Sequence, residues 1–247
     1  MWVNHWLRCA LPGHCAFCLG ETPRATHWCA NCLEQLPWND HACVVCAEPM
    51  ATGTNEGDGA VRCGACLTRP PVFDGAWAPL RYEDEVARLM QTFKFAASPR
   101  AGMLLLSLLE AGLEARIGAS VEQHEAFWPA RQGVEAIIPV PLHPRRARER
   151  GFDQADWLGR RLARRMDLPV IKARRMRVTP TQRGLARQAR RSNLRDAFMI
   201  DSPLPQSVLL LDDVMTTGAT FDALAQACRA AGARRIEVWA VARTPKR

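Results

Sequence analysis

Apolar residues fall into two patterns over the last two thirds of the chain. Four consecutive aliphatic residues at 208–211 predict a strand that is buried on both faces, and apolar positions at helical spacing follow it. Strands are predicted at 76–82, 134–141, 206–214 and 236–242, and helices at 83–93, 101–115, 152–166 and 219–231. Because strands alternate with helices, the pattern favours an α/β fold with a mainly parallel sheet and flanking helices.

The first 70 residues follow neither pattern. They show little regular apolar periodicity and hold four C-x2-C pairs, which account for eight of the ten cysteines. Arg69, Pro70 and Pro71 then form a short, stiff segment. We therefore expect two domains, a cysteine-rich domain at 1–70 and an α/β domain at 72–247.

The four cysteine pairs indicate metal sites. Zinc takes four ligands in a tetrahedron, and two C-x2-C turns supply them. Ten residues separate the first two pairs and sixteen separate the last two, which favours two sites formed by sequential pairing, with cross-brace pairing as the alternative. The predicted Zn2+ ligands are Cys15, Cys18, Cys29, Cys32, Cys43, Cys46, Cys63 and Cys66. Such closed sites are structural, and this domain is expected to need its metal to fold.

Other residues of metal-binding type are expected to serve no metal. His14, His27 and His41 lie beside the cysteine pairs, which already fill both sites, so we expect them to be exposed. Cys228 stands at helical spacing from Phe221 and is expected to lie in the core.

The overall composition is that of a globular protein. The chain has 247 residues, 48% of them hydrophobic, and a formal net charge of +8. Its first residues lack the pattern of a signal peptide, and the apolar run at 102–109 is too short to span a bilayer. These features predict a cytoplasmic protein without membrane insertion.

Positive charge is concentrated in one window. Residues 145–195 contain 17 Lys/Arg and 4 Asp/Glu, a net charge of +13, where an anionic partner could bind. A solvated helix face is the alternative explanation for Arg160, Arg161, Arg164 and Arg165. The aromatic residues of the window are Phe152 and Trp157, which weakens the case for single-stranded DNA, since such binding usually adds stacking platforms. Residues 1–70 are net negative, which argues against the cysteine domain as a nucleic-acid surface.

The exit of the strand at 208–211 carries the candidate site. Asp212 and Asp213 follow directly, and the T-T-G-A-T turn at 216–220 opens the next helix. Carboxylates accept hydrogen bonds from a vicinal diol, and backbone amides at a helix N-terminus favour a phosphate. Gly218 lets the backbone approach such a ligand closely. The arrangement suits a molecule that carries both a sugar diol and a phosphate.

The sequence VLLLDDVMTTGAT at 208–220 resembles the motif with which type I phosphoribosyltransferases bind phosphoribosyl pyrophosphate (PRPP). The resemblance implies that the two acidic residues hold the ribose hydroxyls and that the turn wraps the 5-phosphate. It assigns PRPP binding to Asp212, Asp213, Thr216, Thr217, Gly218, Ala219 and Thr220.

Further segments, together with the cysteine pairs, resemble the ComF/GntX family. They are I-P-V-P-L at 138–142, R-x3-R-G-F-x-Q at 146–154, R-x-R-x-T-x2-Q at 175–182, N-L-x2-A-F at 193–198 and K-F at 94–95. The chain departs from the family pattern at Asp153, where Asn is usual. Both residue types are favoured as the N-cap of a helix, so we expect this departure to be harmless. The resemblance implies a type I phosphoribosyltransferase-like α/β domain preceded by a double zinc ribbon.

The same resemblance implies residue roles. It gives catalytic roles to Asp212, Asp213, Arg145 and Arg146, with Mg2+ bridging the pyrophosphate and the ribose hydroxyls. A flexible segment at 174–195 is expected to close over the site and exclude water. The expected pyrophosphate and flexible-loop residues are Leu142, His143, Arg145, Arg146, Arg150, Arg177 and Gln182.

Three functional hypotheses follow. The first is a phosphoribosyltransferase of unknown acceptor, linked through its family to competence, DNA uptake or the use of DNA. The second is a non-catalytic accessory protein of DNA uptake that senses PRPP or binds single-stranded DNA. The third is a zinc-ribbon adaptor with a vestigial catalytic half, and the intact acidic pair and turn speak against it. Expected partners are PRPP or another phosphoribosyl compound, single-stranded DNA, DNA-uptake proteins and a second copy of the chain in a homodimer.

Overall fold

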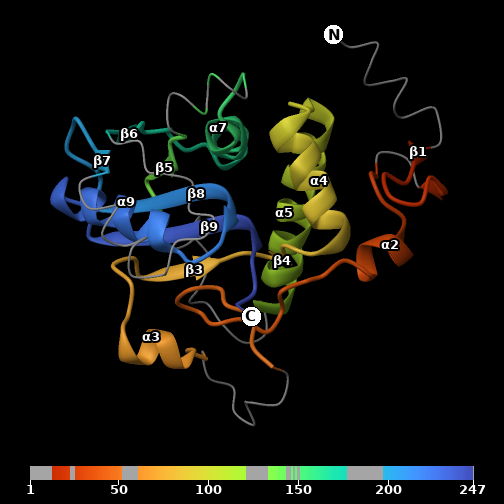
Figure 1. Cartoon of the computed structure of the whole chain (residues 1–247), viewed down its shortest axis with the longest axis horizontal. Helices are drawn as coiled ribbons and strands as arrows, with labels where there is room; N and C mark the ends of the chain where they lie inside the picture. Colours follow the sequence, from red (N-terminus) through yellow and green to blue (C-terminus); the bar gives the residue numbers. More distant parts are fainter. Residues whose placement is uncertain are drawn as a thin grey trace.

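The computed structural model describes residues 13–22, 26–51, 61–120, 133–142, 146, 148, 151–176 and 197–246. The strands are β1 (Gly13–His14), β2 (Glu21–Thr22), β3 (Gly75–Trp77), β4 (Leu80–Arg81), β5 (Ala136–Pro139), β6 (Arg174–Arg175), β7 (Phe198–Met199), β8 (Ser207–Met215) and β9 (Arg235–Arg243). The helices are α2 (Ala30–Glu34), α3 (Gly64–Thr68), α4 (Asp84–Phe95), α5 (Pro99–Ser120), α7 (Gln154–Met166) and α9 (Ala219–Ala230). Figure 1 shows their arrangement in space.

The central sheet is parallel and confirms the predicted fold class. Its strand order is β3-β9-β8-β5, and β4 also pairs with β9. The single strand predicted at 76–82 is divided into β3 and β4 around Pro79. Both pieces keep parallel register with β9, as Trp77 pairs with Trp239 and Leu80 with Ala242. The interruption has a physical reason, because a proline has no N–H to donate to the ladder.

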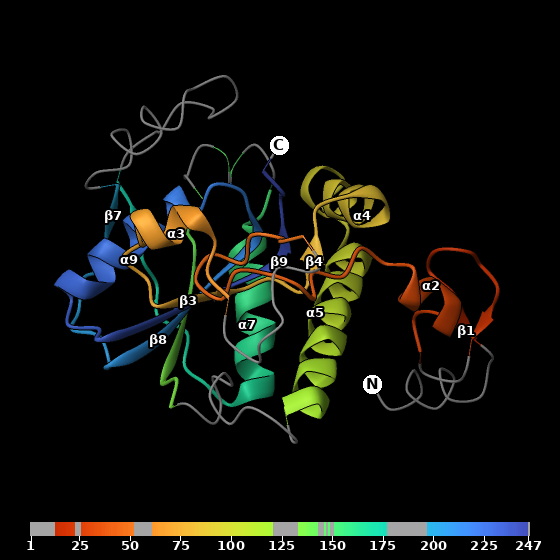
Figure 2. The ribbon, with the colours of Figure 1, turned by 90° about the horizontal axis from the view of Figure 1, so that it is seen from below.

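Both faces of the sheet are covered. Val208 and Leu210 of β8 belong to the core shared with α9, whereas Leu209 and Leu211 belong to the core shared with α4, α5 and α7. In Figure 2 the strands lie between α9 on one side and α7 and α5 on the other. Burial on both faces explains why four aliphatic residues stand in a row in this strand.

Helix α7 packs closely on β5 at the edge of the sheet. A Cβ added at Gly159 would lie 2.5 Å from Cγ of Pro139, so only glycine permits this approach. The helix begins after Asp153, whose side chain accepts a hydrogen bond from the backbone N–H of Asp156. The predicted N-cap is thereby confirmed.

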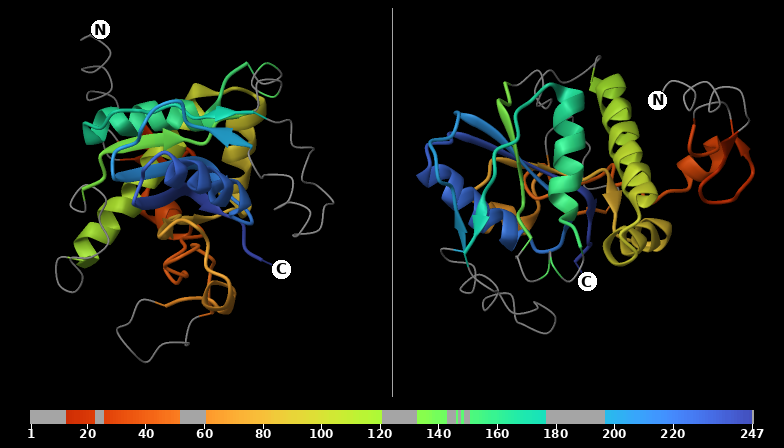
Figure 3. Two further views of the ribbon diagram at one scale, coloured as in Figure 1. Left: turned by 90° about the vertical axis from the view of Figure 1, so that its left-hand side faces the viewer. Right: turned by 90° about the horizontal axis from the view of Figure 1, so that it is seen from above.

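The two cysteine clusters occupy different places. The first, on β1, β2 and α2, lies at one end of the molecule beyond α5 (Figures 2 and 3). The second packs on the sheet, where Val45 and Ala47 are buried in the same core as Val238. The carbonyl of Val44 accepts a hydrogen bond from the backbone N–H of Ala76 in β3. The second cluster is therefore continuous with the core of the sheet.

None of the helices within the described ranges combines the length and apolar character needed to cross a bilayer.

Candidate functional site

The candidate site lies where β8 leaves the hydrophobic core. Asp213 is 6% exposed, and Asp212 beside it is half-buried. The backbone N–H of Asp213 donates to Oδ1 of Asp212 at 2.8 Å. Two adjacent carboxylates are therefore held at the carboxyl end of the central strand, the edge at which parallel α/β sheets commonly bind ligands.

A lysine from α4 compensates one of these carboxylates. Nζ of Lys94 lies 3.0 Å from Oδ1 of Asp213, and the two side chains are 18% and 8% exposed. Phe93, the preceding residue, is fully buried and anchors the end of α4. The sequence reasoning noted Lys94 only as part of a family-like pair with Phe95. Its position at the end of an amphipathic helix was the available signal, but the contact joins residues far apart in the chain.

The second carboxylate, Asp212, is costly to ionise. Burial raises the pKa of Asp212 well above its usual range, and the negative charge of Asp213 raises it further, while Lys94 opposes the shift. Ionised Asp212 is thus costly in the ligand-free protein. A cation or a hydroxyl-rich ligand at this carboxylate would reduce the cost.

The loop expected to hold pyrophosphate begins beside this pair. The backbone N–H of Val140 donates to the carbonyl of Leu211 at 2.8 Å, and that of Leu142 donates to Oδ2 of Asp153 at 2.7 Å. Leu142 is thereby fixed near the exit of β8. His143, Arg145, Arg150, Arg177 and Gln182 lie outside the described residues, so their expected roles stay predictions.

Arg175 lies within electrostatic range of Asp212. Burial lowers the pKa of Arg175, and the positive charge of Arg146 lowers it further, while the negative charge of Asp212 raises it. Arg146 was expected near pyrophosphate, and the structure places it within electrostatic range of Arg175. Arg175, the last residue of β6, is identified from the sequence only as the start of a motif. In the structure Arg175 lies in a short strand that pairs with β7.

The turn after β8 has the backbone of an anion site. Gly218 has φ +77°, in the left-handed region that favours glycine, and it caps the N-terminus of α9. A Cβ at this position would also lie 2.9 Å from Cε of Met215. The structure therefore places Thr216, Thr217, Gly218, Ala219 and Thr220 together at the start of a helix, as the sequence predicted.

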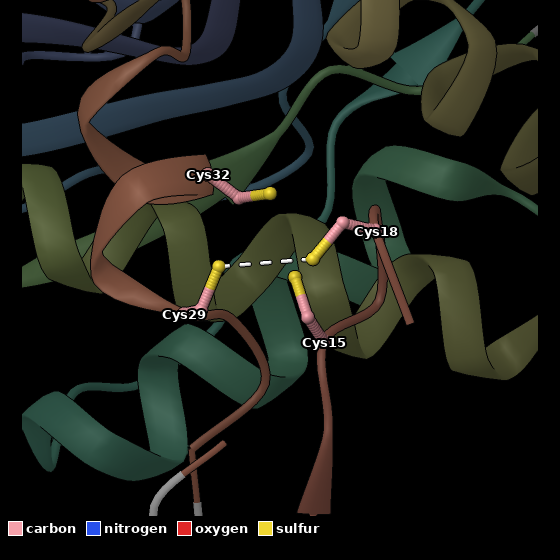
Figure 4. Close-up of side chains that lie close together, drawn as sticks. All are labelled: Cys15, Cys18, Cys29 and Cys32. Atoms are coloured by element: carbon pink, nitrogen blue, oxygen red, sulfur yellow. Dashed lines mark hydrogen bonds between the residues drawn. The ribbon is translucent and has the colours of Figure 1, made fainter. Parts of the chain in front are cut away.

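The eight paired cysteines form two tetrads by sequential pairing. One tetrad is Cys15, Cys18, Cys29 and Cys32, and the other is Cys43, Cys46, Cys63 and Cys66, with the four Sγ atoms of each within 4.8 Å of one another. Figure 4 shows the side chains of the first tetrad, in which Sγ of Cys18 and Sγ of Cys29 are 3.8 Å apart. Sequential pairing is confirmed, and these thiol sets fit tetrahedral zinc.

In the second tetrad the protein favours ionisation of Cys43, whereas the hydrogen bond with Cys43 raises the pKa of Cys46 and burial raises the pKa of Cys66 to about 12. A hydrogen bond from Cys46 lowers the pKa of Cys43 to about 4 against the opposing effect of burial, and the backbone N–H of Cys63 lowers it further. That N–H donates to Sγ of Cys43 at 3.2 Å. His14, His27 and His41 are exposed, and Cys228 is fully buried, as expected.

Sequence comparisons identify the family. Competence protein F of Haemophilus influenzae is 35% identical to this chain over 190 residues, which cover 74% of this chain and 79% of that protein. The chain belongs to the ComF family. DNA utilization protein YhgH of Escherichia coli strain K12 is 31% identical over 192 residues, covering 74% of this ComF-family chain and 78% of that protein.

Two further likenesses concern parts of the ComF-family chain. A family model described as a double zinc ribbon domain matches residues 6–67 and so includes both tetrads. The solved structure of adenine phosphoribosyltransferase from Saccharomyces cerevisiae aligns with 60% of this chain and 72% of its own. Its sequence identity is 16% and its TM-score 0.36.

The basic window of this ComF-family protein is partly neutralised where the structure describes it. On α7, Nε of Arg160 lies 2.7 Å from Oδ2 of Asp156, and Arg165 pairs with Glu110 of α5. The guanidinium of Arg161 lies over the ring of Trp157 at 3.5 Å. These contacts favour the explanation of a solvated helix face for this part of the window. Single-stranded DNA binding stays a prediction that concerns arginines largely outside the described residues.

Proposed function

We propose that this ComF-family protein binds PRPP, with Mg2+, at the carboxyl end of β8 and transfers its phosphoribosyl group to an acceptor. The observation that carries the proposal is the pair Asp212 and Asp213 at the exit of β8, followed at once by the glycine turn and the N-terminus of α9. This order supplies acceptors for a diol and donors for a phosphate at one edge of the sheet.

Each part of the proposed ligand has partners in the chain. The ribose hydroxyls donate to the carboxylates of Asp212 and Asp213, while the ion pair with Lys94 holds Asp213 in position. The 5-phosphate lies on the backbone amides of the turn at 216–220, where Gly218 permits a close approach. Arg175, within electrostatic range of Asp212, and Arg146, within range of Arg175, would compensate the charge of the leaving pyrophosphate.

The residues present also fit magnesium. Mg2+ prefers oxygen ligands, and Asp212 offers a carboxylate whose pKa is raised by burial and by the neighbouring charge of Asp213. Asp212 would hold the ion directly or through water, with the substrate oxygens completing its shell. When bound, the ion supplies charge compensation for the diphosphate group.

The curated relatives support a role in the use of DNA. They are named competence protein F and DNA utilization protein. We extend that role to this chain as part of the proposal, with phosphoribosyl chemistry as its biochemical activity.

The deciding experiment is calorimetric titration of the zinc-loaded protein with Mg-PRPP, repeated with the double variant Asp212→Asn/Asp213→Asn. We expect binding by the natural chain and its loss in the double variant, because the amides cannot replace both charged acceptors. The matched control is Asp156→Asn, which removes an exposed carboxylate on α7 and should leave the titration unchanged. Equal binding by the natural chain and the double variant would contradict the assignment of PRPP binding to Asp212 and Asp213.

A further inference from the structure

Arg243, at the end of β9, joins the second cysteine cluster to the turn after β8. Its side chain is 1% exposed. Nε donates to the carbonyl of Cys46 at 3.1 Å, on the cluster side. Nη1 donates to the carbonyls of Met215, at 3.1 Å, and of Thr216, at the start of the turn. One buried guanidinium thus binds the backbone carbonyl of the cluster cysteine Cys46 and the two backbone carbonyls at which β8 passes into the turn.

Glu48 holds this guanidinium in place. Its Oε2 lies 2.5 Å from Nη2 of Arg243, and its residue exposure is 7%. The backbone carbonyl of Glu48 accepts from the N–H of Cys43 at 2.9 Å, so the main chain of Glu48 belongs to the cysteine turn. Oε1 accepts from the backbone N–H of Lys246 at 2.7 Å, which also ties down the segment after β9. The position of Glu48, and through it that of Arg243, follows from the folding of the second cluster.

The turn itself has open space on the side of this cluster. A small, open hollow of about 40 Å³ is lined by Cys66 of the second cluster, by Phe73 and by Thr217, Gly218 and Asp222. On this side the turn borders Met215 and Phe73 as well as the hollow. The polar contacts from Arg243 act on the two residues at which β8 ends and the turn begins.

We propose that Glu48 and Arg243 are positioning residues through which the second four-cysteine cluster sets the conformation of the turn at 216–218. Metal loss at this cluster would loosen the turn and weaken the phosphate site, and this last consequence rests on the proposed function. The first cluster lies at the far end of the molecule, beyond α5, and serves as an internal comparison (Figure 2).

The primary test is hydrogen exchange of backbone amides in peptides covering 213–222, measured on the zinc-loaded, ligand-free full chain. Glu48→Gln keeps an acceptor for Arg243 but leaves the buried guanidinium without its counter-charge. We expect exchange in these peptides to rise by about tenfold, since local opening becomes easier. The matched control is Asp74→Asn, which removes the carboxylate partner of Arg229 on α9, 2.8 Å away, without touching the turn. An equal rise in both variants would mean general loosening and would overturn the proposal.

The metal itself is tested with paired cysteine variants. Cys46→Ser/Cys66→Ser empties the second cluster, and Cys18→Ser/Cys29→Ser empties the first, with zinc content measured for each. We expect faster exchange at 213–222 only after loss of the second cluster. If the second-cluster variant fails to fold, Glu48→Gln still decides the question.

Affinity for Mg-PRPP is the second measurement and separates the two proposals. We expect Glu48→Gln to weaken binding about tenfold, or about 1.4 kcal/mol, with Asp74→Asn unchanged. Faster exchange in Glu48→Gln without any binding by the natural chain would support the positioning role and contradict the proposed function. Unchanged exchange in Glu48→Gln would overturn the positioning role whatever the chain binds.

Discussion

At the scale of single residues, the site is a pair of carboxylates with unequal partners. Asp213 is paired with Lys94 at 3.0 Å, whereas the pKa of Asp212 is raised by burial and by its neighbour. Buried, uncompensated charge destabilises a folded protein. The chain therefore carries a local cost at Asp212 that a ligand would relieve, which is typical of functional sites.

The cost at Asp212 predicts a pH-dependent gain from Asp212→Asn. The unfolded carboxyl ionises near its usual pKa of 3.8, but the folded one ionises only at a higher pH. Folding of the natural chain is thus favoured below the unfolded pKa and loses stability as pH rises toward the folded pKa. The amide has no charge, so the variant should match the natural chain in acid and exceed it at neutral pH.

Thermal unfolding of both proteins, followed by circular dichroism from pH 4 to 8, measures this difference. A gain in midpoint temperature that grows with pH supports the assignment. A gain that is constant with pH would show that Asp212 is not destabilised by its charge.

Replacing Lys94 should have the opposite effect. Lys94→Met keeps much of the side-chain volume but leaves Asp213, 8% exposed, without its partner. We expect a loss of about 2–4 kcal/mol in the free energy of unfolding, measured by urea titration. Arg160→Met, on the exposed pair of α7, is the matched control and should cost less than about 0.5 kcal/mol. Similar losses in the two variants would contradict a buried role for Lys94.

At the scale of elements, Asp153 ties α7 to the loop that leads into the site. Its Oδ1 accepts from the N–H of Asp156 at 3.1 Å, and its Oδ2 from the N–H of Leu142 at 2.7 Å. Both carboxylate oxygens are therefore used. The family-like Asn has a single carbonyl oxygen and satisfies one of these donors at a time.

This geometry predicts graded losses at Asp153. Asp153→Asn should lower the free energy of unfolding by about 1 kcal/mol, and Asp153→Ala by about 2 kcal/mol, as one and then both acceptors are lost. Urea titration of the three proteins measures the order. Equal stability of the natural chain and the alanine variant would show that neither hydrogen bond contributes.

At the scale of the whole molecule, the two cysteine clusters differ in what they support. The second shares a core with the sheet, and its Glu48 is bound to the end of β9. The first lies apart from the sheet, at the end of the molecule (Figure 3). Metal loss at the second cluster should therefore destabilise the sheet more than metal loss at the first.

Zinc content and unfolding together test this difference. We expect two zinc ions per chain by elemental mass spectrometry, because both thiol tetrads are complete. Cys18→Ser/Cys29→Ser should hold one zinc and keep the unfolding midpoint of the sheet, while Cys46→Ser/Cys66→Ser should lower that midpoint. One zinc in the natural chain would refute the pair of sites.

The sequence by itself determined the local features of this protein. Continuous and helical apolar patterns predicted β8, β9, α7 and α9 within a few residues. The reason is that the spacing of apolar residues along the sequence shows which faces of an element are buried. The short spacers between cysteine pairs predicted the sequential pairing. The turn at 216–220 was predicted because its functional residues follow one another in the sequence. Pro79 marks the limit of this reasoning, since the interruption between β3 and β4 depends on how each piece pairs with β9.

Only the tertiary structure decided which distant residues meet. Lys94 reaches Asp213 because α4 ends beside β8, and Glu48 reaches Arg243 across 195 positions of sequence. No periodicity or spacing encodes such contacts, since they arise from how whole elements pack against one another. The charges that set the properties of the site therefore became visible only when the sheet, the helices and the second cluster were placed together.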